Sequence, residues 1–219
     1  FKRITKNTKI MQIVKHPLFV EKCWSFSLEK HQEYKQRINQ LLLVEKNKEK
    51  HKHTTEANKK CNVFAWRSDW NSHKNYPVLR EIADDIGTHI VEIMKEEKIK
   101  FDLDYNFLNL ASCWVNNYKK GDHAVPHRHF LYGFSAVYFT DIPENSSEFL
   151  FYNPIGLNLE SELDENQPTL KLNMLEGSVI IFRGYLQHGV TEHLNNKERT
   201  TVALNYELAS NEGRDGTTI

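Results

Sequence analysis

The sequence predicts an α+β fold that is mainly β, and two observations support this prediction. Apolar residues at helical spacing are confined to the first 100 residues of the chain. From about residue 101 onward, short runs rich in Val, Phe, Tyr, Trp and Thr alternate with Gly, Pro, Asn and Asp, which is typical of strands joined by turns. Helices first and many short strands afterwards indicate a β-sandwich or small barrel. The runs predicted as strands are 112–118, 134–140, 148–152, 178–182, 189–193 and 200–208.

The N-terminal part is predicted to supply supporting elements. Apolar residues within the first ~25, interrupted by Pro17, predict one or two short strands. Residues 28–50 carry apolar side chains at roughly helical spacing among many Lys, Glu and Gln, and predict an amphipathic helix. A clearer helix begins at Pro77, since proline suits the first helical position, and its apolar stripe runs to Met94. The expected organisation is supporting elements over 1–100, a core forming one structural unit over 101–210 and a tail over 211–219.

Composition excludes several classes of protein. The chain has 219 residues, and its 29 basic and 29 acidic residues cancel, so no overall positive field favours nucleic acid or a membrane surface. The longest apolar runs, such as 179–182, are far too short to span a bilayer. Cys23, Cys61 and Cys113 are odd in number and widely spaced, which is typical of a reducing compartment and argues against a cysteine zinc site. We therefore expect a cytoplasmic protein.

Three histidines form a candidate metal site. His127 and His129 are two residues apart after Pro126, which favours extended backbone, so both imidazoles are expected on the same side of a strand. His188 follows a buried strand and a turn, and is expected to open the next strand. Three imidazoles brought together could cap a metal ion. The alternative interpretation is that one or more of these histidines are ordinary surface or core side chains.

Arg199 is a candidate binding residue for a carboxylate. In the strand that it opens, alternation places Arg199, Thr201 and Asn205 on one face and apolar side chains on the other. A lone guanidinium inside a barrel is costly, and a dicarboxylate ligand would supply its partner through a fixed fork of donors. The alternative is a structural ion pair with Glu176 or Glu192.

The order of these residues resembles a known family, the Fe(II)/2-oxoglutarate-dependent oxygenases, and within it a type found widely in bacteria and marine phages. The resemblance covers roughly 105–208, about half of the chain, and it implies a double-stranded β-helix (jelly-roll, cupin-like) core with the N-terminal helices packed against it. Its specificity lies in the order and spacing of the motifs, since no single one is decisive. The matching positions are Trp114 and Asn116, Asn117 and Tyr118, Gly121, His127 and His129, Ser135 and Tyr138, the block 177–190, and Arg199 with Asn205.

The resemblance implies roles for these positions. His127 and His188 would be the first and last iron ligands. Arg199 would bind the distal carboxylate of 2-oxoglutarate. The remaining residues of the implied cosubstrate site are Thr201, Tyr138 and Asn205.

The second metal ligand departs from the common pattern of the oxygenases. Most relatives have Asp or Glu two residues after the first histidine, where this chain has His129. Iron also binds nitrogen ligands well, so a cap of three histidines is chemically reasonable, although a third neutral imidazole leaves the charge of the ion uncompensated. The alternative is a carboxylate from elsewhere, either Asp122 or Glu148.

The implied activity is that of a dioxygenase, and more specifically a hydroxylase. Such an enzyme uses Fe(II), 2-oxoglutarate and dioxygen, and couples the decarboxylation of 2-oxoglutarate to succinate with oxidation of a C–H bond. Two alternatives remain: a three-histidine dioxygenase that needs no 2-oxoglutarate, and a non-catalytic cupin-like module that binds a metal such as zinc.

The sequence leaves the substrate open between a small molecule and a peptidyl side chain. The N-terminal strand and helix are candidate elements of a homodimer. The aromatic residues near the first histidines that are candidates for a substrate pocket, or else for the core, are Trp114, Phe130, Tyr132 and Phe134.

Overall fold

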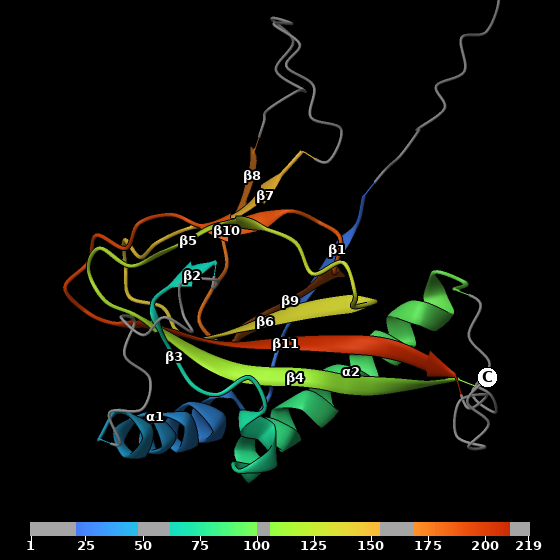
Figure 1. Ribbon diagram of the computed structural model, residues 1–219, viewed down its shortest axis with the longest axis horizontal. Helices are drawn as coiled ribbons and strands as arrows, with labels where there is room; N and C mark the ends of the chain where they lie inside the picture. The colour runs from blue at the N-terminus through green and yellow to red at the C-terminus, as the bar shows by residue number, and fades with distance from the viewer. Residues whose placement is uncertain (1–20, 48–61, 100–105, 154–168, 211–219) are drawn as a thin grey trace, which may run out of the picture.

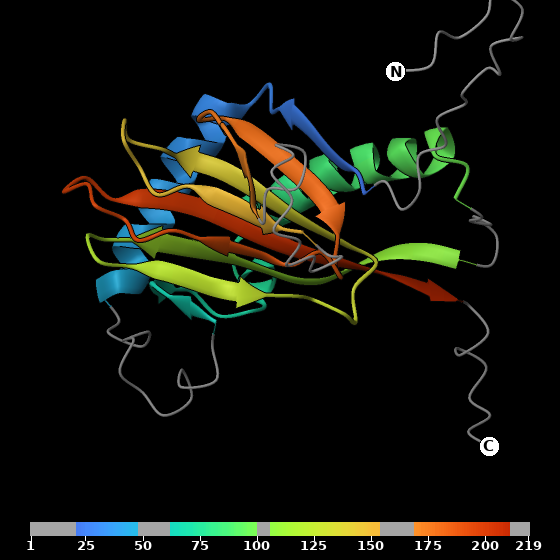
Figure 2. The same cartoon turned by 90° about the horizontal axis from the view of Figure 1, so that it is seen from above.

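Two antiparallel sheets and a layer of helices make up the computed structural model, which describes residues 21–47, 62–99, 106–153 and 169–210 (Figure 1). The six-stranded sheet has the order β1-β9-β6-β11-β4-β3, and the five-stranded sheet has the order β2-β5-β10-β7-β8. Seen from above, the small sheet lies over the large one (Figure 2). This arrangement confirms the prediction of a double-stranded β-helix, α+β and mainly β.

The strands agree closely with the predicted runs. Six of them match within a few residues; the longest extension is at the start of β4, where Leu108 and Leu110 continue the pairing with β11. The bounds are β1 Cys23–Ser27, β2 Val63–Phe64, β3 Trp66–Arg67, β4 Asn106–Tyr118, β5 His123–His127, β6 Phe134–Asp141, β7 Phe149–Tyr152, β8 Thr169–Leu172, β9 Ser178–Arg183, β10 His188–Val190 and β11 Arg199–Ser210. The predicted strands before Lys22 and the predicted C-terminal tail lie outside the described residues.

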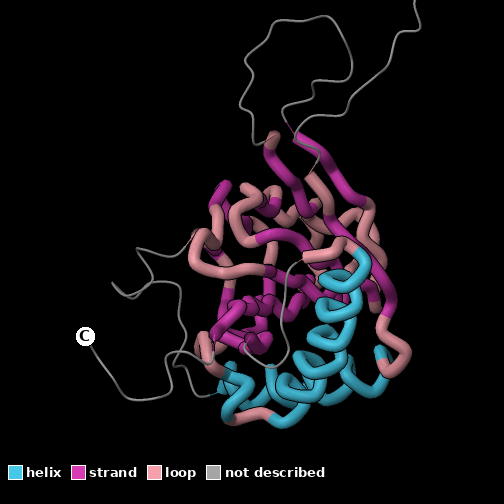
Figure 3. Tube along the Cα trace, turned by 90° about the vertical axis from the view of Figure 1, so that its right-hand side faces the viewer, coloured by secondary structure: helices cyan, strands magenta, loops and turns pink. Residues whose placement is uncertain are grey.

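Both predicted helices are present and cover one face of the large sheet (Figure 3). Helix α1 spans His31–Asn47 and helix α2 spans Pro77–Glu96, with Pro77 in the first turn as expected. The apolar stripe of α2, including Ile82, Ile86 and Ile90, is fully buried against the sheet. No helix in the described ranges is long and apolar enough to cross a membrane.

The large sheet therefore has two buried faces. One face packs on the helices and forms a core with Val202, Leu204 and Tyr206 from β11. The other face packs on the small sheet and forms a second core with Phe139, Phe149 and Phe182. Because strand side chains alternate, neighbouring residues of β6 and β11 enter different cores. The candidate site lies in the second core, between the two sheets.

Candidate metal centre

Three histidines meet where β5 and β10 pair. His127 is the last residue of β5, and it lies opposite His188, the first residue of β10. His129 follows two residues after β5. One ring nitrogen of each histidine lies within 4.8 Å of the corresponding atoms of the other two. Two nitrogens bound at a right angle to one metal ion are about 3 Å apart, so small ring movements would complete such a site.

The ring orientation of two of these histidines leaves a free nitrogen for a metal. His127 Nδ1 lies 2.8 Å from the carbonyl oxygen of Val125, and His188 Nδ1 lies 2.9 Å from that of Leu186. A carbonyl oxygen only accepts hydrogen bonds, so each Nδ1 must carry the proton and donate it. Each Nε2 then keeps a lone pair. The second hydrogen bond of a metal-binding histidine commonly has this form.

Asn205 holds His129 in the same way. The Nδ1 atom of His129 lies 2.7 Å from Asn205 Oδ1, which also accepts from the hydroxyl of Ser135 at 2.8 Å. The amide nitrogen of Asn205 donates to Ser112 Oγ at 3.1 Å, which fixes the orientation of the amide. Asn205, predicted among the cosubstrate-binding residues, thus contacts a histidine of the cluster.

Burial keeps the three imidazoles neutral. It lowers the pKa of His129 to about 4, with a further contribution from nearby His127. Burial also lowers the pKa of His127 and holds the pKa of His188 well below its ordinary value. At neutral pH all three rings are thus in the form that binds metal ions.

His129 does not lie in a strand, contrary to the prediction. Strand β5 ends at His127, and the chain then turns, with the N–H of Tyr132 donating to the carbonyl oxygen of His129 at 3.0 Å. The N–H of His129 donates to the carbonyl oxygen of Gly184 at 2.6 Å. A Cβ atom at Gly184 would lie only 2.6 Å from the carbonyl oxygen of His129, so glycine is required for this close approach. The turn, rather than strand alternation, directs His129 toward the other two rings.

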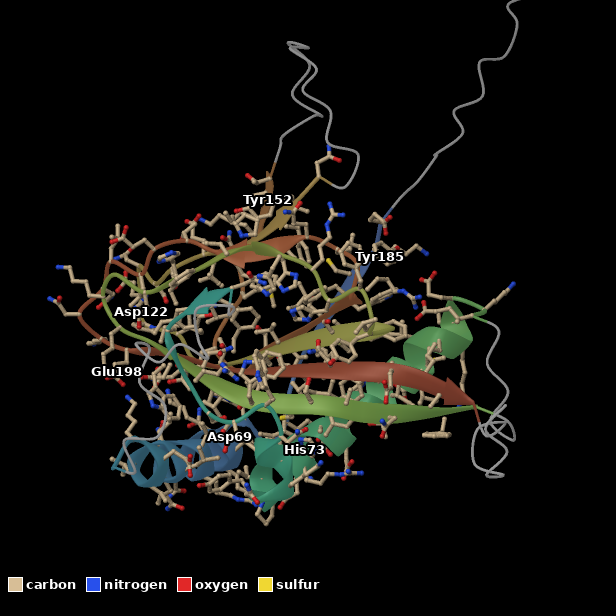
Figure 4. All side chains as sticks on the ribbon, in the orientation of Figure 1. Asp69, His73, Asp122, Tyr152, Tyr185 and Glu198 are labelled. Carbon is tan, nitrogen blue, oxygen red and sulfur yellow. The ribbon has the colours of Figure 1, made fainter. Side chains whose placement is uncertain are left out.

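Neither alternative carboxylate belongs to the cluster. Asp122 accepts a hydrogen bond from the N–H of Lys119 at 2.8 Å, in the turn at the left edge of Figure 4. Glu148 forms an ion pair with Lys171 at the surface. Within the described ranges, no Asp, Glu or Cys joins the three histidines in a group that could hold a metal.

Arg199 is buried and has no anionic partner among the described residues. Its side chain is 1% exposed, and its Nε and Nη1 atoms find no hydrogen-bond partner in that part of the chain. The guanidinium carbon lies 4.9 Å from the ring centre of Tyr118 and 5.6 Å from that of Phe139. Burial lowers the pKa of Arg199, and its interaction with Tyr118 opposes that effect. A buried cation with free donors is a strong candidate for binding an anionic ligand.

The alternative ion pair of Arg199 is absent. Glu176 instead contacts Lys35 Nζ at 2.8 Å and His31 Nε2 at 3.2 Å, beside helix α1. Among the described residues, Glu192 forms no ion pair with Arg199 either.

Arg199 and the three histidines line one cavity of about 40 Å³, which we call the inner cavity. Thr201, 2% exposed, lines it as well and lies on the same strand face as Arg199. Free Nε2 atoms and free guanidinium donors around one space suit a metal ion together with a carboxylate ligand.

Tyr138, predicted as a cosubstrate-binding residue, does not line this cavity. It pairs with Val202, and both side chains enter the core beneath the helices. Its hydroxyl lies 2.7 Å from His31 Nδ1 in α1. The neighbouring Phe139, which pairs with Thr201, instead enters the second core between the two sheets, which we call the inner core.

A larger pocket of about 450 Å³ opens beside His127 and His129, and we call it the front pocket. Of the four predicted aromatic candidates, Trp114 and Tyr132 line it. Phe134 is fully buried beneath the helices, and Phe130 is 71% exposed on the turn. Four residues that line the front pocket were not predicted: Asn62, Trp70, Asn71 and Ser112. Of these, Ser112 in β4 pairs directly with the predicted site residue Asn205 in β11.

Comparisons with known proteins are consistent with this geometry. Residues 112–205 match a family model described as "Putative 2OG-Fe(II) oxygenase". A comparison with curated protein sequences finds no match.

Solved structures show the same fold at low identity. A prolyl hydroxylase from Trichoplax adhaerens, in complex with a peptide fragment of the hypoxia inducible factor oxygen degradation domain, is 12% identical; the alignment covers 84% of this chain and 83% of that one, with a TM-score of 0.57. HygX from Streptomyces hygroscopicus, with nickel, 2-oxoglutarate and hygromycin B bound, is 10% identical. The alignment covers 85% of this chain and 83% of HygX, also with a TM-score of 0.57. The chain spans less than half of a 2OG-Fe(II) oxygenase family protein from Burkholderia pseudomallei. That alignment covers 46% of this chain and 45% of the other, with 20% identity and a TM-score of 0.38.

The family match and the double-stranded β-helix fold bear out the resemblance read from the sequence. Residues 112–205 of the chain are thus similar to the 2OG-Fe(II) oxygenases, and the fold is that of the solved structures compared above.

Proposed function

We propose that this protein is an Fe(II)- and 2-oxoglutarate-dependent oxygenase, more specifically a hydroxylase, that binds Fe(II) through His127, His129 and His188 and binds 2-oxoglutarate through Arg199. The observation that carries the proposal is the inner cavity itself. It combines three imidazoles whose Nδ1 atoms are all occupied with a buried guanidinium that has two free donors.

Each residue has a distinct task in this proposal. The three histidines hold the metal on one face, and Asn205 keeps His129 in the tautomer that can bind it. Arg199 would donate to the distal carboxylate of 2-oxoglutarate, with the hydroxyl of Thr201 as a further donor. Phe149 and Phe182 also line the inner cavity and exclude water from it. The bound iron would supply the oxidising chemistry that couples succinate formation to C–H oxidation.

Ligation by three neutral imidazoles has an electrostatic consequence. A carboxylate ligand would offset one of the two charges of Fe(II), whereas His129 offsets none. The cosubstrate would therefore carry the compensating negative charge in this cavity. We expect 2-oxoglutarate and the metal to bind with strong mutual dependence.

A three-histidine dioxygenase that needs no 2-oxoglutarate is the second candidate, because no carboxylate joins the described cluster. The unpaired Arg199 in the same cavity favours the first candidate, because the second candidate has no ligand for the guanidinium. A cupin-like module that holds zinc would use the same three histidines and would show no turnover.

We propose a neutral small molecule or peptidyl side chain as the substrate. The front pocket supports this class, because its walls combine Trp70, Trp114 and Tyr132 with the amides of Asn62 and Asn71, and no Asp, Glu, Lys or Arg is among the described residues that line it. One similar structure contains a peptide and another contains hygromycin B, so this fold serves both kinds of ligand. A cytoplasmic location and a homodimer belong to the same proposal, and the balanced charge argues against nucleic acid.

Anaerobic addition of Fe(II) and 2-oxoglutarate tests the proposal. We expect a weak metal-to-ligand charge-transfer band in the visible region that is lost in Arg199→Ala and kept in Arg80→Ala, an exposed control. Oxygen uptake should then yield succinate. No band in the wild-type protein would contradict the proposal, and turnover without 2-oxoglutarate in Arg199→Ala would favour the second candidate.

A further inference from the structure

Arg199 lines a second space besides the inner cavity. This pocket of about 260 Å³ is also lined by Phe139, Ser146, Ser147 and Lys171, and we call it the back pocket. It adjoins the turn between β6 and β7 and the end of β8. None of the three histidines lines it, whereas all three line the inner cavity. Arg199 and Phe149 line both spaces, which places them at the boundary.

Several polar atoms around the back pocket have no hydrogen-bond partner within the described ranges. These are the hydroxyl oxygens of Ser146 and Ser147, together with Nε and Nη1 of Arg199. Ser147 is only 9% exposed and Arg199 only 1%, so solvent at the protein surface does not readily satisfy them. Buried hydroxyl and guanidinium donors without partners are costly, and a ligand with acceptor oxygens would satisfy them together.

The free volume next to Arg199 is distributed unevenly. The inner cavity measures about 40 Å³, which is room for only a few water molecules, whereas the back pocket measures about 260 Å³. A carboxylate ligand of Arg199 therefore finds most of the open space on the side away from the histidines.

The charges around the back pocket permit an anion. Glu148 lines the pocket, but it is paired with Lys171, which lines it as well. The remaining charged lining residue is Arg199, so the pocket has a net positive charge at neutral pH. The free donors and the positive charge together favour a carboxylate group.

We propose that the cosubstrate site continues past Arg199 into the back pocket, so that the protein also binds 2-oxo dicarboxylates longer than 2-oxoglutarate. The inference rests on the proposed function, because it takes the inner cavity as the site of the 2-oxo acid. The distal carboxylate of a longer acid would accept hydrogen bonds from the hydroxyls of Ser146 and Ser147 while Arg199 still neutralises it.

Anaerobic titration of the Fe(II)-loaded protein with 2-oxoglutarate and with 2-oxoadipate tests the inference. The readouts are the charge-transfer band and the heat of binding. We expect the dissociation constants of the two acids to lie within about tenfold of each other. Ser147→Ala should weaken 2-oxoadipate binding roughly tenfold by removing a hydrogen bond to a charged group, and leave 2-oxoglutarate binding unchanged.

The matched control is Ser25→Ala, a serine exposed on edge strand β1, which should change neither constant. Ser147→Ala should fold normally, because the contact that positions this residue is its backbone N–H, 3.2 Å from His193 Nδ1. Ser147→Val, which also fills the back pocket, should reduce 2-oxoadipate binding further.

Two outcomes overturn the inference while leaving the proposed function intact. One is 2-oxoadipate binding more than roughly 100-fold weaker than 2-oxoglutarate binding in the wild-type protein. The other is an equal loss for both acids in Ser147→Ala. Absence of a band with 2-oxoglutarate itself would instead overturn the proposed function along with the inference.

Discussion

The two faces of strand β11 differ in whether their buried polar atoms have hydrogen-bond partners among the described residues. On the face toward the helices, Val202 and Leu204 pack among aliphatic side chains, and the hydroxyl of Tyr206 donates to the carbonyl oxygen of Ala83 at 2.7 Å. On the face toward the small sheet, Arg199 is equally buried, yet two of its nitrogens have no partner.

Because of this difference, one face of β11 contributes mainly to the stability of the fold and the other mainly to ligand binding. Burial of apolar surface and satisfied polar groups stabilise the fold on the helix side. An unpaired buried cation destabilises the fold on the barrel side, and a ligand would recover that free energy. Side-chain alternation thus lets adjacent residues serve opposite purposes. Substitutions on one face should leave the property carried by the other face unchanged.

The largest expected effect is that of Arg199→Leu. The free energy of unfolding should stay equal or rise, because an unpaired buried charge is replaced by an apolar side chain. The affinity for 2-oxoglutarate should fall by about 2–5 kcal/mol, since the carboxylate loses its buried cationic partner. Urea unfolding and anaerobic titration of the charge-transfer band measure the two quantities. A large loss of stability with 2-oxoglutarate absent would show that Arg199 is structural.

Ile86→Ala should have the reverse pattern. Ile86 is fully buried between α2 and the large sheet, so its truncation should lower the free energy of unfolding by about 2–5 kcal/mol. At a temperature where the variant remains folded, its affinity for Fe(II) and 2-oxoglutarate should equal that of the wild-type protein. A parallel loss of affinity would mean that the two faces are coupled through the sheet.

Asn205→Ala tests the residue of β11 that is hydrogen-bonded to His129. Removal of its amide takes away the 2.7 Å acceptor of His129 Nδ1 and leaves the longer 3.1 Å contact with Ser135 Oγ, so the imidazole is held less firmly. We expect about 10–100-fold weaker metal binding, typical of the loss of such a supporting contact. Competition with a coloured chelator measures this change. Asn205→Asp, which retains the acceptor, should restore much of the affinity, whereas a purely structural role would not distinguish the two variants.

The sequence was sufficient for both helices, for most of the strands and for the approach of the three histidines. The apolar stripe after Pro77 identified α2, and alternation from Arg199 onward correctly separated the two faces of β11. The spacing of His127 and His188 also anticipated their approach, and the structure places these two residues opposite each other.

The remaining site residues depend on register and on contacts that a sequence does not reveal. His129 reaches the cluster through a turn held by Gly184, not through strand alternation. Asn205 meets His129 next to a β-bulge, where the pairing of β11 with β4 shifts by one residue. Strand parity alone could not show which of Tyr138 and Phe139 enters the inner core, because this follows from the pairing of Phe139 with Thr201.

Tyr138→Phe has the smallest expected effect. It distinguishes the role of Tyr138 implied by the family resemblance from the contact that Tyr138 makes in the structure. The resemblance implied a contact between Tyr138 and 2-oxoglutarate, whereas its hydroxyl lies 2.7 Å from His31 Nδ1 on the helix side. Loss of this hydrogen bond should lower the free energy of unfolding by about 0.5–1.5 kcal/mol. The affinity for 2-oxoglutarate should not change, because the ring is in the core beneath the helices. If the affinity falls while stability is unaffected, Tyr138 faces the cosubstrate in the active protein, and β6 must then adopt a different register against β11.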